Sequence, residues 1–181
     1  MADGLQGAVI GATGALVAGF FANFMAEDYR RFREAKALSG AIYGELTSIT
    51  SGLDELSESI DKVISALELG GSIKLPEIQF PKNDIYEEYM GRLGLLDSSV
   101  VENIVYVYSQ INSFRASYSL LCKPKLSGAM KIKYLKAARN SLNRASARKE
   151  ILYEKLQAIC CSRYCPFGVC AHVYEWLRKL Y

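Results

Sequence analysis

The stretch that decides the fold is Leu5–Ala26, LQGAVIGATGALVAGFFANFMA, which contains no charged residue. A helix needs about 20 predominantly apolar residues to cross the hydrocarbon core of a bilayer. We therefore predict a transmembrane helix within residues 1–28. Only Met-Ala-Asp-Gly precedes the stretch, so it lacks the basic region that begins a cleaved secretory signal.

Basic residues follow the apolar stretch directly, at Arg30, Arg31, Arg33 and Lys36. Lys and Arg next to a membrane helix favour the cytoplasmic side of the bilayer. This charge pattern predicts a single-pass protein of the inner (cytoplasmic) membrane. Its N-terminus would lie outside and its C-terminal domain in the cytoplasm.

Small residues recur every four positions along the apolar stretch, at Gly7, Gly11, Ala15 and Gly19. Small side chains at this spacing let the backbones of membrane helices approach closely. We therefore predict that this face is a membrane oligomerisation surface and that the protein is a homo-oligomer. The alternative is a helix buried in a soluble core or interface, which the long absence of charge disfavours.

A heptad pattern follows, with apolar residues spaced alternately by four and three positions. Its members are Ile42, Leu46, Ile49, Leu53, Leu56, Ile60, Val63 and Leu67. Such a seam is typical of a coiled coil or of a helix in a bundle. It predicts a juxtamembrane helix over residues 29–71 that ends at Gly70-Gly71. A seam within one chain and a coiled coil between chains both remain open.

The remaining sequence predicts further helices and no strand. Residues 72–83, with Pro76 and Pro81, form a predicted loop, and residues 84–181 form a helical domain. Its expected helices are Ile85–Leu93, one from a capping box of Ser99 and Glu102 to about Leu121, Ser127–Ile159, and Val169–Leu180 after a Cys-rich turn. The predicted fold class is all-α, with the transmembrane helix leading into a cytosolic helical bundle whose first helix is coiled-coil-like.

Charge is distributed unevenly along the chain. Residues 41–102 hold twelve acids and four bases, whereas residues 103–149 hold ten bases and no acid. The predicted ligand-binding residues lie opposite the apolar stripe of the long helix, at Lys133, Lys136, Arg139 and Arg144. Such a surface attracts an anionic ligand, a nucleotide, or anionic lipid headgroups. The alternatives are a solvated face, or a face that pairs with the acidic heptad helix.

The C-terminal region carries a cysteine group, Cys161-x3-Cys165-x4-Cys170-x-His172. These four residues are enough for a tetrahedral zinc site, although their spacing matches no standard zinc-finger signature. Free thiols, a disulfide and lipidation are the alternatives. Because His172 is the only histidine and no phosphate-binding P-loop occurs, we expect no enzyme activity. We expect no cofactor other than this possible zinc.

Two stretches, ALSGAIYGELTSI (37–49) and FPKNDIYEEYMGRLGLLDSSVVENIVYVYSQI (80–111), resemble a broad group of uncharacterised bacterial proteins. Those proteins have one N-terminal membrane helix, a coiled segment with an Ala-Leu…Glu-Leu motif, and a cytosolic helical domain. The layout also resembles small membrane effectors of bacterial antiviral systems, including some that accompany type III CRISPR. In those, a cytosolic domain senses a nucleotide signal and the oligomeric membrane part perturbs the bilayer.

The resemblance implies an oligomeric membrane protein whose helical domain senses an anionic, nucleotide-like signal and acts at the membrane. The alternative function is a membrane-tethered adaptor or scaffold that binds a protein partner through its charged faces.

Overall fold

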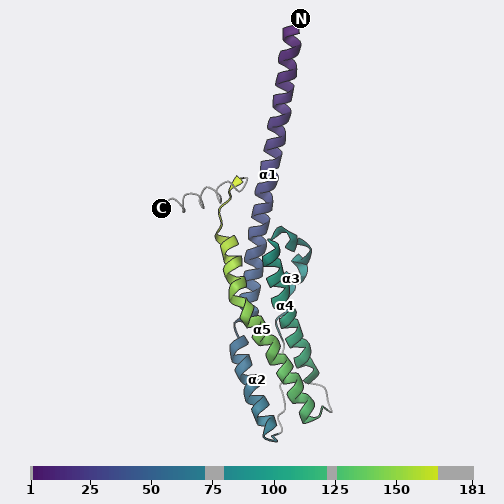
Figure 1. Cartoon of the computed structure of the whole chain (residues 1–181), viewed down its shortest axis with the longest axis vertical. Coiled ribbons are helices and arrows are strands. Elements are labelled where there is room, and N and C mark those ends of the chain that lie inside the picture. Colours follow the sequence, from purple (N-terminus) through teal and green to yellow (C-terminus); the bar gives the residue numbers. More distant parts are fainter. Residues whose placement is uncertain (1, 72–79, 122–125, 167–181) are drawn as a thin grey trace, which may run out of the picture. The chain divides into compact units, whose positions relative to one another are not determined.

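The computed structural model describes residues 2–71, 80–121 and 126–166, and their side chains from Ile10 onward (Figure 1). Every element in these ranges is a helix, so the all-helical prediction is confirmed. The elements are α1 (Ala2–Thr50), α2 (Leu53–Glu68), α3 (Asp84–Tyr89), the 3-10 helix η1 (Met90–Leu95), α4 (Ser98–Leu121) and α5 (Gly128–Cys161). The expected helix Val169–Leu180 lies outside the described residues.

The chain divides into two compact units. The first holds the residues up to Ala37 together with those from Cys161 onward, and the second is Leu38–Cys160. Each unit has its own internal contacts.

The first unit contains a long apolar helix whose side chains are uncovered. Within the described residues, this is the one helix long and apolar enough to span a membrane, and none of its most apolar window is buried. The large exposed side chains in it are Ile10, Leu16, Val17, Phe20, Phe21 and Phe24. An exposed apolar surface of this kind marks contact with a membrane or with another protein.

The segment after α5 packs on α1 beyond the apolar stretch, within the same unit. The Tyr164 hydroxyl donates to Asp28 Oδ2 at 3.0 Å, and its ring meets Tyr29 edge-on with centroids 4.9 Å apart. Lys36 Nζ donates to the Ser162 carbonyl at 3.0 Å. Residues 162–164 are therefore held on α1 by polar and aromatic contacts.

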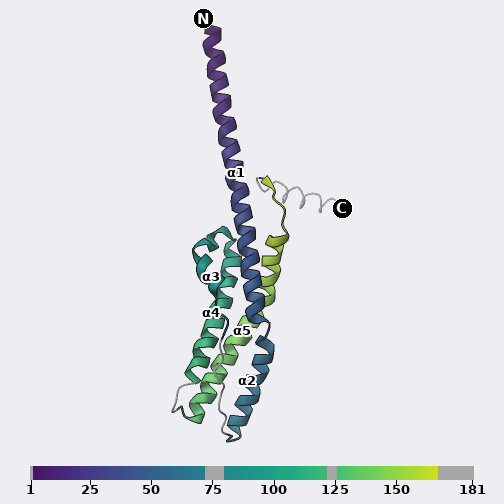
Figure 2. The ribbon, with the colours of Figure 1, turned by 180° about the vertical axis from the view of Figure 1, so that it is seen from behind.

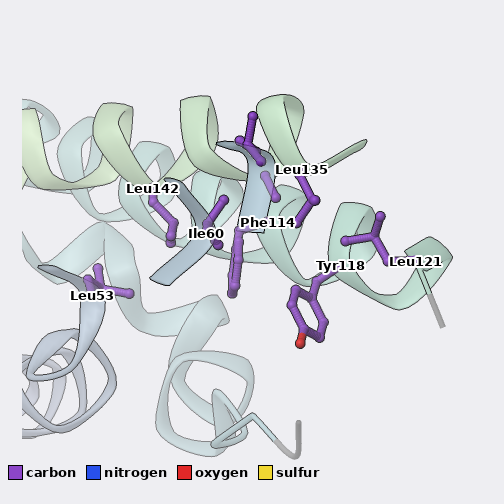
Figure 3. Close-up of a cluster of buried hydrophobic side chains, with 9 residues drawn as sticks. Leu53, Ile60, Phe114, Tyr118, Leu121, Leu135 and Leu142 are labelled. Atoms are coloured by element: carbon purple, nitrogen blue, oxygen red, sulfur yellow. The ribbon is translucent and has the colours of Figure 1, made fainter. Parts of the chain in front are cut away.

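In the second unit, the heptad seam packs within the chain. Ile42 and Leu46 are 0% exposed, and Leu53 and Ile60 are buried as well. The part of the core around α2 is shown in Figure 3, and α4 and α5 supply most of it. Its buried members from these two helices are Phe114, Tyr118, Leu121, Leu135, Ala138 and Leu142. Of the two alternatives left open by the sequence, these contacts support the seam within one chain.

The predicted juxtamembrane helix is interrupted. The sequence predicts one helix over residues 29–71, whereas α1 ends at Thr50 and α2 begins at Leu53. Thr50 shares a hydrogen bond with the Tyr153 hydroxyl of α5, and Ser51 Oγ donates back to the Ser48 carbonyl at 3.0 Å. Gly52 adds a residue of low helix propensity. A hydrogen bond to α5, a local side-chain bond and a glycine thus accompany the end of α1 inside a continuous heptad pattern.

Glycine ends α2, as the sequence predicts. Gly70 has a φ of +83°, a left-handed conformation that residues with a Cβ adopt at a cost. The Gly71 N–H donates to the Ala66 carbonyl at 3.0 Å. A Cβ on Gly71 would lie only 2.8 Å from that carbonyl oxygen, so this close return of the chain requires glycine.

Helices α4 and α5 lie side by side in both views (Figures 1 and 2). In the sequence, apolar residues at helical spacing run from Val101 to Leu121 and from Leu135 to Ile159, and these two faces match the buried residues with two differences. Val100 is buried in place of Val101, and Ile159 is only partly buried. The faces are recovered because a period of 3.6 residues identifies the buried side of a long helix.

The start of α4 differs from the prediction. The capping residue is Asp97 rather than Ser99, because Asp97 Oδ1 accepts a hydrogen bond from the Ser99 N–H at 2.8 Å. Hydrogen bonds from the Ser99 side chain and backbone hold the pKa of Asp97 below its usual range. The helix expected at Ile85–Leu93 is instead the short α3 followed by η1.

The capping assignment predicts that Asp97→Ala lowers the midpoint of thermal unfolding more than Ser99→Ala does, because only Asp97 accepts the free N–H of the first turn. Circular dichroism of the full chain in detergent would measure both. Because the Asp97 pKa is lowered in the fold, its stabilisation is present above about pH 4, the ordinary value for Asp. It is lost as the pH falls through the lowered pKa. Equal midpoints for the two variants would contradict the assignment.

Candidate functional site

Two of the four predicted ligand-binding residues are paired with acids of α2. Lys136 Nζ lies 2.8 Å from Glu68 Oε1, and Arg139 Nε lies 2.5 Å from Asp61 Oδ1. This is one of the alternatives that the sequence left open, in which the basic face of α5 meets the acidic heptad helix. An anion that bound Lys136 and Arg139 would therefore have to compete with two carboxylates.

The other two predicted residues, Lys133 and Arg144, are exposed. Within the described ranges, no carboxylate lies within 4.0 Å of either side chain, the limit for an ion pair. They are eleven positions apart, which is about 16 Å along a helix. The four bases thus form a row along α5 and do not converge on one point, so a compact anion could contact only part of the row.

The ion pairs between α2 and α5 are at the surface. The side chains of Lys136 and Glu68 are 56% and 48% exposed, and those of Arg139 and Asp61 are 42% and 41% exposed. Exposed pairs of this kind stabilise by about 0–1 kcal/mol each and weaken as salt concentration rises. This contact therefore orients α2 without holding it strongly.

A polar centre that the sequence did not reveal is built around Glu45 of α1. Its Oε1 accepts the Ile85 N–H at 2.8 Å, and its Oε2 accepts the Tyr86 N–H at 3.1 Å and the Tyr108 hydroxyl at 2.5 Å. Burial, and then the hydrogen bond to Glu45, raises the pKa of Tyr108 well above its usual range. The tyrosine therefore stays protonated and donates to Glu45.

The rings beside Glu45 complete this centre. Tyr86 of α3 stacks on Tyr108 of α4, with ring centroids 4.0 Å apart and an interplanar angle of 12°. Glu45 belongs to the first resemblance stretch, 37–49, and both tyrosines belong to the second, 80–111. In the sequence, only the presence of both stretches in one chain pointed to a contact between Glu45 and these tyrosines. Because each contact of Glu45 is a structural hydrogen bond, we assign it a positioning role.

A second polar group lies where the chain enters α3. The buried side chain of Asn83 donates through Nδ2 to Asn112 Oδ1 at 3.0 Å. Arg115 Nη1 donates to the same oxygen at 3.4 Å, and Arg115 Nη2 donates to the Pro81 carbonyl. Burial lowers the pKa of Arg115 from its very high ordinary value. Both acceptors of this guanidinium are neutral groups.

The small-residue face of the apolar helix is open where it is described. A Cβ built on Gly11 or Gly19 would meet nothing within 4 Å, and Ala15 is exposed. The surroundings of Gly7 lie outside the described side chains. Self-association through this face stays a prediction.

The predicted zinc ligands fall only partly in the described chain. Cys161 is an exposed free thiol, Cys165 is disulfide-bonded, and Cys170 and His172 lie outside the described residues. Among the residues that the structure describes, no three His, Cys, Asp or Glu side chains are grouped so as to hold a metal ion. A zinc site would require Cys165 in its reduced form, and it stays a prediction.

Comparisons with protein-family models, with curated proteins and with solved structures find no match to this chain. The site is therefore interpreted from its own geometry. The resemblance in layout to membrane effectors stays an expectation.

The Glu45 centre predicts that Glu45→Gln destabilises the protein by about 2 kcal/mol, because hydrogen bonds to a charged acceptor contribute about 1.5–3 kcal/mol. Urea unfolding of the full chain in detergent, followed by circular dichroism, would measure the free energy of unfolding. Glu55→Gln is the matched control, since Glu55 is exposed on α2 and should change stability little. An unchanged stability of Glu45→Gln would contradict the role of this carboxylate.

Proposed function

We propose that the protein is an oligomeric single-span membrane protein whose cytosolic helical bundle senses an anionic signal, such as a nucleotide, and acts at the membrane. The observation that carries the membrane part is the uncovered apolar segment of α1, with six large exposed apolar side chains between Ile10 and Phe24. In water this surface would promote aggregation, whereas in a bilayer it is solvated by lipid.

The orientation follows from the charges beside the apolar segment. Arg30 and Arg31 pair with Glu27, and Arg33 is a further exposed base in the same turn region. By the positive-inside rule, this end of the segment faces the cytoplasm. The helical bundle would then lie in the cytoplasm, beneath the inner membrane.

The sensing part is supported by the contact between α2 and α5. Exposed ion pairs join the helices at Lys136–Glu68 and Arg139–Asp61. An anion with several negative charges can replace Glu68 and Asp61 along the row of bases that also includes Lys133. Because each pair contributes little, an anion could displace both carboxylates, and α2, still held by its buried Leu53, Ile60 and Ile64, would then shift its packing on α5.

Acting at the membrane would require a change in how the apolar helices associate. The open face at Gly11, Ala15 and Gly19 is a surface on which identical helices could pack closely. By its resemblance in layout, the proposed effect is that of a bacterial antiviral effector, in which the assembled helices perturb the bilayer.

The oligomer is tested by Gly11→Leu in the full chain, purified in detergent, with the mass of the particle measured by light scattering. A leucine on the small-residue face separates the helix backbones, so we expect about a ten-fold weaker association, equal to about 1.4 kcal/mol. Val17→Phe is the control, because position 17 lies two residues from Ala15 and hence on the opposite side of the helix. A monomeric wild type, or two variants that assemble equally well, would remove the proposed oligomer.

The anion site is tested by removing its competitors. In the double variant Asp61→Asn, Glu68→Gln, the bases of α5 are freed, so the affinity for a bound anion should rise several-fold. Thermal shifts with nucleoside triphosphates and with cyclic dinucleotides would screen for the ligand, and titration calorimetry would give its affinity. The control variant Glu55→Gln, Glu58→Gln removes the same charge from the exposed face of α2.

An absence of any shift in wild type and in the freed variant would reject the anion sensor. The charged face would then favour the second candidate function, an adaptor that binds a protein partner. In that case Lys136→Glu with Arg139→Glu should abolish capture of the partner, while no nucleotide binds.

A further inference from the structure

A cavity of about 300 Å³ opens in the second unit, beside the break between α1 and α2. Its lining comes from the end of α1 and the start of α2, at Ile49 and Leu53, and from Ile111 and Phe114 of α4. Phe80 and Pro81 line it as well. The cavity is separate from the row of bases on α5.

The cavity is large enough for a small organic molecule. A water molecule occupies about 30 Å³ of liquid volume, so this space corresponds to a ligand of about ten non-hydrogen atoms. It lies at the lower end of the range of ligand pockets, which are mostly apolar with a few polar groups that orient the ligand. Here the polar residues of the lining are Ser48, Ser51 and Arg115.

Arg115 is the charged residue of this lining. Its guanidinium donates to the Pro81 carbonyl and to Asn112 Oδ1. Within the described chain, no carboxylate lies within 4.0 Å of the Arg115 guanidinium, the limit for an ion pair. Lys136 and Arg139, by contrast, each have a carboxylate partner. Arg115 is also partly buried, where attraction to an anion is screened less than at an open surface.

We propose that this cavity binds a small amphiphilic anion, with its apolar part among Ile49, Leu53 and Phe114 and its carboxylate paired with Arg115. A guanidinium offers two parallel N–H donors to a carboxylate, and such pairs are stronger than neutral hydrogen bonds. The apolar walls would select a chain or ring of about eight carbons. A free nucleotide does not fit this description, because its base and sugar carry many polar groups and its volume is larger.

The test is isothermal titration of octanoate into the full chain held in phosphatidylcholine nanodiscs, with the heat of empty nanodiscs subtracted. Octanoate matches the volume of the cavity and carries one carboxylate. We expect one octanoate per chain and at least a ten-fold weaker affinity in Arg115→Gln. 1-Octanol, which has the same chain without the charge, should bind both proteins equally.

Two further variants separate the cavity from general effects of charge and of folding. Lys62→Gln removes an exposed base of α2 outside the cavity, and it should leave the octanoate affinity unchanged. Ser48→Phe fills the cavity from an exposed position, so it should abolish binding while the helical circular dichroism is kept. Absence of octanoate binding to wild type would overturn the proposal. Equal binding to wild type, Arg115→Gln and Ser48→Phe would overturn it as well.

Discussion

The carboxylate of Glu45 is the interaction on which the second unit depends. It joins three helices, since it lies on α1, accepts the first N–H groups of α3 at Ile85 and Tyr86, and accepts the hydroxyl of Tyr108 on α4. A partly buried carboxylate is costly unless it is fully hydrogen-bonded. Here each oxygen has at least one donor, so this partly buried carboxylate specifies how the helices meet, while the apolar seam around Leu46 supplies the buried surface.

Charged side chains have different surroundings elsewhere in the molecule. Between α2 and α5 they form exposed and therefore weak pairs, which suit a contact that a competing anion can open. The charged side chain of Arg115 lines a largely apolar cavity, and its hydrogen-bond acceptors are neutral groups. In the first unit, bases border an apolar segment that no other part of the described chain covers. The three settings support three separate proposals, for sensing, for a second ligand and for membrane attachment.

The sequence predicts what depends on periodicity and misses what depends on distant partners. The heptads from Ile42 and the buried faces of α4 and α5 follow from regular spacing within single helices. The break after Thr50 does not, because it involves Tyr153, far along the chain. The role of Glu45 could not be predicted either, because its partners are also far along the chain and its sequence pattern is that of an acid on a solvated helix face. For the predicted anion site, the residue types were recognised, yet no spacing rule could show that Glu68 and Asp61 would occupy half of it.

The way α3 is capped has a consequence for the order of folding. Asn83, the residue that precedes its first turn, makes no capping hydrogen bond with its side chain. A helix of six residues is also too short to be stable alone in water. The missing cap comes from Glu45, 40 positions earlier in the chain. We therefore expect helix α3 to form after α1 has reached it, as a late step in folding that depends on a non-local contact. Contacts between such distant residues slow folding, because the intervening loop must close first.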